Sequence, residues 1–341
     1  MKDRYESKIE CLFDQTIVLY PVTHEAGIMK FGIVGAGAMG CLLGSFLARA
    51  KENVWLVDIW EEHVSRINND GLTVISKGKL DRVTICATTN TRDVGICDVV
   101  IISTKFHHTR AAIQNALCMI DKKTVVMTIQ NGIGNVETIS EFVNKKQIIF
   151  GLTTLGSVIK GPGKIDATFS DEAATYIWPL IGDPDDKLRN FIDAFKHTGL
   201  NFHLSPDIRE QIWKKLCLNA SLSMPLAIPR LKCGDFINQP PSLDLIRGLV
   251  HEIVAVANKE GVALNPKETY EYVETLAKQA PDHLPSPLID LLNQRKTEID
   301  CLNGAVIVKA KRYGIEVPYN TAIYHLIKII ENTYDKSIQH I

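Results

Sequence analysis

Short apolar runs alternate with amphipathic stretches through the first half of the chain. The runs have the length and β-branched content of buried strands, and they cover residues 30–34, 53–57, 98–103, 124–129 and 147–152. Between them, apolar side chains recur at helical spacing over residues 41–51, 60–69, 108–120 and 136–144. Because strands that alternate with helices form parallel sheets, this half predicts a parallel sheet covered by helices on both faces.

The pattern becomes less regular in parts of this first half. Two short strands are expected at residues 72–75 and 82–87. A Gly-Pro-Gly turn at residues 161–163 separates strand-like pieces, which we expect to extend the sheet in an antiparallel direction. Residues 184–197 predict one more helix.

From about Pro206 onward, the apolar positions follow helical spacing with few interruptions. The expected helices cover residues 207–223, 241–260, 266–279, 286–311 and 318–335. Stretches such as GVALNPKE and APDHLPSP separate them. We therefore expect an α/β domain over residues 29–205, followed by an all-helical domain for substrate binding and dimerisation over residues 206–341.

The first 28 residues differ from the rest. Charges are spread through them, and no small-residue cleavage site follows an apolar region, which argues against a signal peptide. Met29 then precedes the first apolar run. We expect residues 1–28 to be an N-terminal extension that lies outside the fold.

Composition narrows the class of partner. The formal net charge is -1, so the chain has no basic excess with which to neutralise the phosphates of a nucleic acid. It contains no apolar run of about 18 residues that could span a bilayer. The 8 cysteines include no CxxC pair and no His/Cys cluster at zinc spacing, which favours reduced thiols, a cytoplasmic protein and no metal site. The expected ligand is a small molecule.

A glycine-rich turn connects the first strand to the first helix. It reads Gly35-Ala36-Gly37-Ala38-Met39-Gly40, and all six residues are candidates for cofactor binding. In a G-x-G-x-x-G turn the first glycine permits the tight turn, the second lets the backbone approach a pyrophosphate, and the third allows the helix to pack on the strand. The following helix N-terminus favours phosphate. The turn therefore predicts a doubly wound Rossmann sheet that binds NAD(P)H, although a glycine-rich turn without a ligand is the alternative.

An acidic residue follows the second strand. Asp58 lies 18 residues after Gly40 and is placed to accept hydrogen bonds from the ribose hydroxyls, while repelling a 2′-phosphate. It favours NADH over NADPH, because Arg49, Lys51 and Arg66 do not obviously offer a phosphate clamp. The alternative role of Asp58 is to cap the next helix.

Polar residues in four later segments suggest a catalytic site. Lys105 and Asn131 follow two of the parallel strands, at the edge where ligands bind in such sheets. Lys215 and Asn219 are four residues apart and share a helix face, while Glu298 lies in a polar cluster of the helix expected over residues 286–311. Burial can lower the pKa of a lysine enough for it to protonate the carbonyl oxygen of a 2-keto acid.

Three motifs together carry a resemblance to a known family. They are N-G-I-G at residues 131–134, W-x-K-x3-N at 213–219 and T-E-I-D-x2-N-G at 297–304. From Met29 to about residue 335 the chain resembles ketopantoate reductase (2-dehydropantoate 2-reductase). The resemblance implies a Rossmann domain followed by an all-helical domain, with the active site in the cleft between them. It implies NAD(P)H-dependent reduction of ketopantoate to (R)-pantoate, in pantothenate and coenzyme A synthesis.

The resemblance also assigns roles to residues. It makes Lys215 the general acid and Glu298 a partner that orients this lysine or the substrate hydroxyl. Asn219 and Ser286 would hold the substrate. Lys105 and Asn131 would contact the cofactor and the substrate edge of the cleft. Asp290 would brace its helix. Ser223 stands where the family usually has a second asparagine.

Plainer roles stay open for each of these residues. Lys215 and Lys105 could be solvated surface lysines, Glu298 could pair with Arg295, Asn131 could only form a turn, and Ser286 could only cap a helix. His107 and His108 are expected to be surface residues at a helix start.

Two other functions are alternatives. An acid at position 58 and a serine at position 223 favour an NADH-dependent D-2-hydroxyacid dehydrogenase that acts on another branched 2-keto acid. A non-catalytic NAD(P)H-binding sensor is the alternative of another class. A homodimer is possible by analogy with other helical C-terminal domains.

Overall fold

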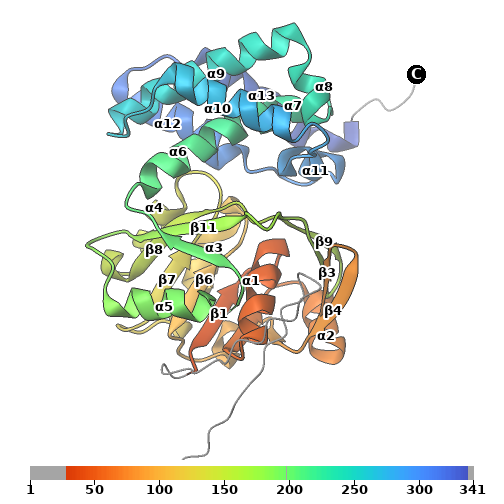
Figure 1. Ribbon diagram of the computed structural model, residues 1–341, viewed down its shortest axis with the longest axis vertical. Helices are drawn as coiled ribbons and strands as arrows, with labels where there is room; N and C mark the ends of the chain where they lie inside the picture. Colours follow the sequence, from red (N-terminus) through yellow and green to blue (C-terminus); the bar gives the residue numbers. More distant parts are fainter. Residues whose placement is uncertain (1–27, 197, 337–341) are drawn as a thin grey trace, which may run out of the picture. The chain divides into compact units, whose positions relative to one another are not determined.

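The computed structural model describes residues 28–196 and 198–336. The expected extension at residues 1–28 lies outside them, apart from Ile28. The chain divides into two compact units (Figure 1). The first unit ends at Pro206 and leaves out Asn131–Asn135, which group with the second unit; the rest of the second unit begins at Asp207.

An eight-stranded sheet forms the centre of the first unit, with the strand order β12-β11-β8-β7-β6-β1-β2-β5. Its strands are β1 (Lys30–Val34), β2 (Asn53–Val57), β5 (Cys86–Thr88), β6 (Val99–Ile102), β7 (Val125–Thr128), β8 (Ile148–Thr153), β11 (Ala174–Pro179) and β12 (Asn201–Leu204). All neighbours are parallel except β8 and β11. The expected α/β fold is therefore confirmed, with β12 as an additional strand that the sequence pattern did not predict.

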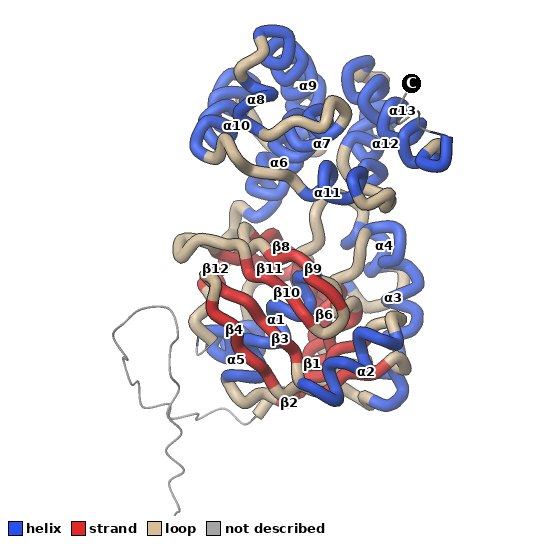
Figure 2. The backbone as a smooth tube through the Cα atoms, turned by 90° about the vertical axis from the view of Figure 1, so that its right-hand side faces the viewer, coloured by secondary structure: helices blue, strands red, loops and turns tan. Residues whose placement is uncertain are grey.

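Helices cover both faces of this sheet, as Figure 2 shows for the strands in red. They are α1 (Ala38–Arg49), α2 (Glu61–Asp70), α3 (Thr109–Ala116), α4 (Asn135–Ser140) and α5 (Asp186–Lys196). Alternate residues of β1 face opposite sides of the sheet. Phe31 and Ile33 pack in one core cluster, together with α1 and α5. Val34 packs in the other cluster with α3.

A second, four-stranded sheet corrects two expectations. Its order is β4-β3-β10-β9, formed by β3 (Leu72–Ser76), β4 (Lys79–Val83), β9 (Ser157–Gly161) and β10 (Lys164–Ala167). The hairpin around the Gly-Pro-Gly turn does not extend the main sheet, because β10 pairs in parallel with β3. The strand expected over residues 82–87 is two strands in different sheets, β4 and β5.

The second unit is helical from α6 (Ile208–Leu218) onward. A π-helical segment, Asn219–Ser223, continues α6 into α7 (Met224–Ala227). The other helices are α8 (Cys233–Ile237), α9 (Pro240–Lys259), α10 (Pro266–Gln279), α11 (Ser286–Leu292), α12 (Asn303–Tyr313) and α13 (Pro318–Asn332). The apolar face of α9 is buried, and α6, α10, α12 and α13 pack around it.

One expected helix is wrong. The helix over residues 286–311 is broken into α11, a connecting segment, a 3-10 turn at Ile299–Cys301 and α12. Gln294 takes a left-handed backbone conformation with φ of 54°, which ends α11. The short helix α8 was not expected from the sequence.

Candidate functional site

In the glycine-rich turn of the first unit, steric contacts require glycine at positions 35 and 40, whereas position 37 faces open space. Gly35 has φ of 101°, and a Cβ there would lie 2.8 Å from the main chain of Ser103. A Cβ at Gly40 would lie 2.0 Å from the carbonyl oxygen of Gly35, so the helix can pack this closely on the turn only without a side chain. At Gly37 a Cβ would meet nothing within 4 Å.

This open space lies at the N-terminus of α1. Gly37 is the N-cap residue, no side chain caps the helix, and its first turn holds no acidic residue. The first backbone N–H groups of a helix have no partner within the helix and attract anions. The turn Gly35–Gly40, which includes Ala36, Ala38 and Met39, therefore fits the pyrophosphate of a dinucleotide.

Asp58 follows β2, the strand beside β1. It is half-buried, and its Oδ1 accepts a hydrogen bond of 3.0 Å from the backbone N–H of Trp60. The N-cap residue of α2 is Trp60 itself, so Asp58 shapes the turn before this helix rather than capping it. Glu61 and Glu62 add two more acids in the first turn of α2.

Arg49, at the end of α1, and Arg66, in α2, each contact a carboxylate. Arg49 lies 2.8 Å from Asp81, and Arg66 lies 2.8 Å from Asp70. Their guanidinium groups are thus already paired with carboxylates. The acid at position 58 keeps its negative surroundings, which disfavour a 2′-phosphate.

Lys105 lies beyond the carboxyl end of β6. It is half-buried and is the N-cap residue of a 3-10 turn, Phe106–His108. The neighbouring Thr104 carbonyl accepts a hydrogen bond of 2.6 Å from Gln130 Nε2, which also donates to Thr109 Oγ1 at 2.9 Å. Gln130 therefore braces the loop of Lys105. His107 and His108 are exposed in that 3-10 turn.

Lys215 lies in α6 of the second unit. Burial lowers the pKa of its ammonium group to about 8, while the nearby Glu298 carboxylate acts in the opposite direction and raises it. The adjacent Lys214 is the solvated lysine, since its Nζ lies 2.6 Å from Glu210 on the outer side of the helix. Lys215 therefore combines a depressed pKa with a neighbouring carboxylate, a combination common at catalytic sites.

The π-helical segment begins at the next candidate, Asn219. Its carbonyl accepts from the backbone N–H of Met224, five residues on, instead of four. Such wide turns occur frequently at functional sites because they redirect side chains. Ser223 ends the segment and is buried, and the Ser221 hydroxyl donates to the Cys217 carbonyl at 2.7 Å.

Glu298 and Asn131 come together although 167 residues separate them. Asn131 Nδ2 donates to Glu298 Oε2 at 3.3 Å. Two residues on, Ile133 donates its backbone N–H to the Cys301 carbonyl at 2.9 Å. Gly132 has φ of 80°, and a Cβ there would lie 2.5 Å from that carbonyl oxygen. The N-G-I-G loop therefore needs its glycine to dock on the segment of Glu298.

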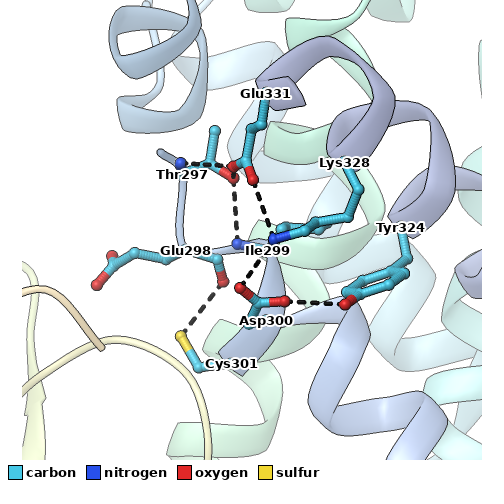
Figure 3. Close-up of polar contacts among 8 residues, drawn as sticks. All are labelled: Thr297, Glu298, Ile299, Asp300, Cys301, Tyr324, Lys328 and Glu331. Atoms are coloured by element: carbon cyan, nitrogen blue, oxygen red, sulfur yellow. Dashed lines mark hydrogen bonds and ion pairs between the residues drawn. The ribbon is translucent and has the colours of Figure 1, made fainter. Parts of the chain in front are cut away.

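The expectation that Glu298 lies in a helix is wrong. Glu298 is in the segment between α11 and α12, just before the 3-10 turn. Arg295, which was considered as its ion-pair partner, has its Nε 3.5 Å from Asp290 Oδ1. Figure 3 shows the Glu298 carboxylate pointing away from the polar side chains of α13.

The remaining candidates lie in α11, which packs against the π-helical segment and α7. Ser286 is exposed in the first turn, where Pro285 is the N-cap residue, so the capping role considered for Ser286 does not apply. Asp290 is buried one turn later, and the Arg295 backbone N–H donates to its carbonyl at 2.8 Å.

Sequence reasoning did not single out Gln130 in the first unit, which braces the loop of Lys105, or Asn303 and Glu331 in the second unit, which hydrogen-bond to Ala220 and Thr297. Gln130 and Asn303 lie inside motifs that were noticed, next to Asn131 and just before Gly304. Glu331 carries no local signal, because it contacts Thr297 across 34 residues. Only the folded chain brings Glu331 to the site.

Comparison with known proteins gives matches over most of the chain. The family model "Ketopantoate reductase PanE/ApbA" matches residues 31–179, and "Ketopantoate reductase PanE/ApbA C terminal" matches residues 207–331. A 2-dehydropantoate 2-reductase of Lactococcus lactis subsp. lactis is 31% identical over 304 residues, which cover 88% of this chain and 97% of that protein.

Two solved structures are similar to the fold. The ternary structure of D-mandelate dehydrogenase with NADH and anilino(oxo)acetate has a TM-score of 0.85 at 29% identity, covering 90% of this chain and 100% of the other. A PanE/ApbA family ketopantoate reductase from Ralstonia eutropha JMP134 has a TM-score of 0.82 at 27% identity, covering 90% and 100%.

Proposed function

Because the chain belongs to the ketopantoate reductase family, we propose that it reduces the keto group of 2-dehydropantoate with NAD(P)H to give (R)-pantoate. The observation that carries the proposal is Lys215, a desolvated lysine beside the carboxylate of Glu298. A non-catalytic sensor would have no use for this pair. The expected role of the enzyme is in pantothenate and coenzyme A synthesis.

The proton in this reaction comes from Lys215. Reduced nicotinamide, when bound, supplies a hydride to the keto carbon, and the carbonyl oxygen then needs a proton. With a pKa of about 8, Lys215 is mostly protonated at neutral pH and is a stronger acid than an ordinary lysine. It donates its proton to the oxygen, becomes neutral, and regains a proton from solvent.

Glu298 supports this step in two ways. Its negative charge favours the ammonium form of Lys215, which keeps the acid loaded before the reaction. Its carboxylate is held by Asn131, so it keeps a fixed orientation toward the lysine or the substrate hydroxyl. Asn219, one turn after Lys215, would hold the same oxygen or the substrate carboxylate. Ser223 and Ser286 are proposed as further substrate contacts.

The first unit supplies the cofactor site. The residues Gly35–Gly40 would hold the pyrophosphate at the start of α1, and Asp58 would accept hydrogen bonds from the adenosine ribose. Lys105 would contact the cofactor from its braced loop. No metal is needed for proton transfer by a lysine.

A second candidate function has specific support. Asp58 with its acidic neighbours, and the pairing of Arg49 and Arg66, favour NADH. Ser223 stands where the family usually has an asparagine that would contact the substrate. These features fit an NADH-dependent D-2-hydroxyacid dehydrogenase that acts on another branched 2-keto acid.

One experiment separates the two functions. Initial rates of ketopantoate reduction would be measured with NADPH and with NADH on the same purified protein, beside other branched 2-keto acids. Turnover of ketopantoate at the highest kcat/KM supports the reductase. Turnover restricted to another branched 2-keto acid supports the dehydrogenase and contradicts the leading proposal. NAD(P)H binding without turnover of any keto acid supports the sensor.

Further proposals concern assembly and location. In the described part of the chain, no helix is long and apolar enough to cross a membrane. We propose a cytoplasmic homodimer. An exposed stripe on α13 supports it, since Tyr319, Leu326 and Ile329 are 47%, 45% and 59% exposed on one helix face. The test is light scattering of a Leu326→Glu variant. If its molar mass equals that of the wild type, the proposal that this stripe forms the dimer interface is wrong.

A further inference from the structure

The segment that carries Glu298 is fastened to α13 by a buried carboxylate. Glu331 Oε1 accepts two hydrogen bonds of 2.7 Å, from the backbone N–H and from the hydroxyl of Thr297 (Figure 3). The same hydroxyl accepts from the backbone N–H of Ile299 at 3.2 Å. The Glu331 side chain is only 1% exposed, so these bonds are shielded from water.

A second attachment lies on the other side of Glu298. Asp300 accepts a hydrogen bond of 3.0 Å from the Tyr324 hydroxyl, and its other oxygen lies 3.2 Å from Lys328 Nζ. Lys328 also lies 3.2 Å from Glu331 Oε2, so one cation joins the two attachments. Tyr324, Lys328 and Glu331 follow helical spacing and share a face of α13.

Glu298 faces the opposite way. Thr297 and Asp300 point toward α13, whereas the Glu298 carboxylate points away from it (Figure 3), toward Asn131 Nδ2. Because the attached residues flank Glu298 in the chain, they determine where its backbone lies.

Stability alone is a weak reason for this arrangement. Taking charges out of water offsets much of what an ion pair gains, and apolar residues of similar volume often stabilise a fold as well. Hydrogen bonds to a buried charge, however, restrict a segment to one geometry. A segment without secondary structure needs such restriction if it carries a group that must act at a defined place.

We propose that Thr297, Glu331 and Lys328, with Asp300, are positioning residues that hold Glu298 at the place from which it acts on Lys215. The inference rests on the proposed function, because it takes the roles of Lys215 and Glu298 from there. None of the four residues is a catalytic residue. They act through the backbone of the segment they hold.

The test compares two substitutions of one residue. Thr297→Val keeps the volume of the side chain but removes the hydroxyl that joins Glu331 to the Ile299 N–H, whereas Thr297→Ser keeps that hydroxyl. In Thr297→Val we expect kcat to fall about tenfold through displacement of Glu298. The basic limb of the pH profile should move to lower pH, since Lys215 loses part of the charge that raises its pKa. Thr297→Ser should restore the wild-type profile.

Glu331→Gln tests the other end of the contact. It keeps an oxygen that can accept from Thr297 but removes the charge that faces Lys328, so we expect the same direction of change. Glu260→Gln is the matched control, because Glu260 also pairs with a lysine and a tyrosine of the second unit, Lys309 at 2.6 Å and Tyr313 at 2.8 Å. It should lower the Tm without moving the pH profile.

The outcomes separate this inference from the proposed function. If Lys215→Ala and Glu298→Gln lower the rate but Thr297→Val and Glu331→Gln keep the wild-type pH profile, the positioning role is wrong and the proposed function stands. An equal shift of the profile in Glu260→Gln would also overturn the positioning role, because the effect would then be general destabilisation. Wild-type rates in Lys215→Ala and Glu298→Gln would refute the proposed function itself.

Discussion

Asn303 Nδ2 donates a hydrogen bond of 3.1 Å to the carbonyl oxygen of Ala220, inside the π-helical segment. In a π-helix this carbonyl would accept from the residue five positions on, which is Pro225 and has no N–H. Asn303 supplies the missing donor. It is itself held by Asn320, whose Oδ1 accepts from Asn303 Nδ2 at 2.9 Å.

A buried carboxylate completes this connection. Glu252 of α9 accepts from the backbone N–H groups of Tyr319 and Asn320 and from Asn320 Nδ2, at 2.8 to 2.9 Å. It therefore serves as a negative cap at the N-terminus of α13, where the helix dipole favours an anion. The π-helical turn that begins at Asn219 is thus connected through Asn303 and Asn320 to Glu252 in α9.

We expect Asn303→Ala to destabilise the protein by about 1–3 kcal/mol, because it leaves the Ala220 carbonyl buried without a donor. KM for the keto acid should rise more than kcat falls, since the turn carries Asn219 rather than Lys215. Asn258→Ala is the control, because Asn258 makes two hydrogen bonds to the backbone of Leu264 away from this turn. A similar loss of stability with unchanged KM in Asn303→Ala would contradict a role in the substrate site.

Replacing Lys215 should separate chemistry from cofactor binding. In Lys215→Ala we expect kcat to fall by about 10² to 10⁴, the usual contribution of a general acid, while the Kd for NADH measured by fluorescence titration stays near that of the wild type. Lys214→Ala is the matched control, since that lysine pairs with Glu210 at the surface. Full activity in Lys215→Ala would remove the basis of the proposed mechanism.

The direction of the reaction decides the sign of its pH dependence. Reduction needs the charged form of Lys215, so its rate should fall as the pH rises through the pKa of about 8. Oxidation of the hydroxy acid needs the neutral form and should slow as the pH falls below that value. Glu298→Gln removes the charge that raises the pKa, and both limbs should then move to lower pH. Profiles of kcat/KM in both directions check this, and limbs that stay in place would exclude Lys215 as the titrating group.

Two glycines of the cofactor turn should respond differently to alanine. Gly37→Ala places a Cβ in open space and should leave the Tm close to that of the wild type, while weakening NADH binding where the pyrophosphate would lie. Gly40→Ala places a Cβ 2.0 Å from the Gly35 carbonyl oxygen and should lower both Tm and affinity. Thermal unfolding and cofactor titration of the pair test the assignment; unchanged affinity in Gly37→Ala would count against it.

Asp58 should set the choice between the two cofactors. Asp58→Asn keeps an oxygen that can accept from the Trp60 N–H but removes the charge that repels a 2′-phosphate, so KM for NADPH should fall relative to KM for NADH. Asp98→Asn is the control, because Asp98 also accepts a backbone N–H, that of Lys30, near the start of the strands. An unchanged ratio of the two KM values in Asp58→Asn would assign Asp58 to the turn alone.

Local pattern was sufficient for much of this protein. The bounds of β1 and β2 agree with the apolar runs, because strands buried on both faces consist of consecutive apolar residues that end at turn residues. The turn Gly35–Gly40 was recognisable because its three glycines have the spacing of a dinucleotide-binding turn between a strand and a helix, although the space at Gly35 is closed by Ser103, far along the chain. The helices α9 and α10 carry their own proline and asparagine start signals.

Long-range contacts decided the rest. The sequence alone could place Lys215 and Asn219 on one helix face, because that relation spans four residues. It could not place Glu298, because the polar run Asn293–Glu298 does not show which way the chain turns between the apolar stretches on either side. After the break at Gln294, the position of the segment is set by hydrogen bonds from Thr297 to Glu331, 34 residues away, and from Asn131 to Glu298, 167 residues away. Hydrogen bonds between such distant residues form only once the chain has folded, so the tertiary structure alone determined where the candidate catalytic carboxylate lies.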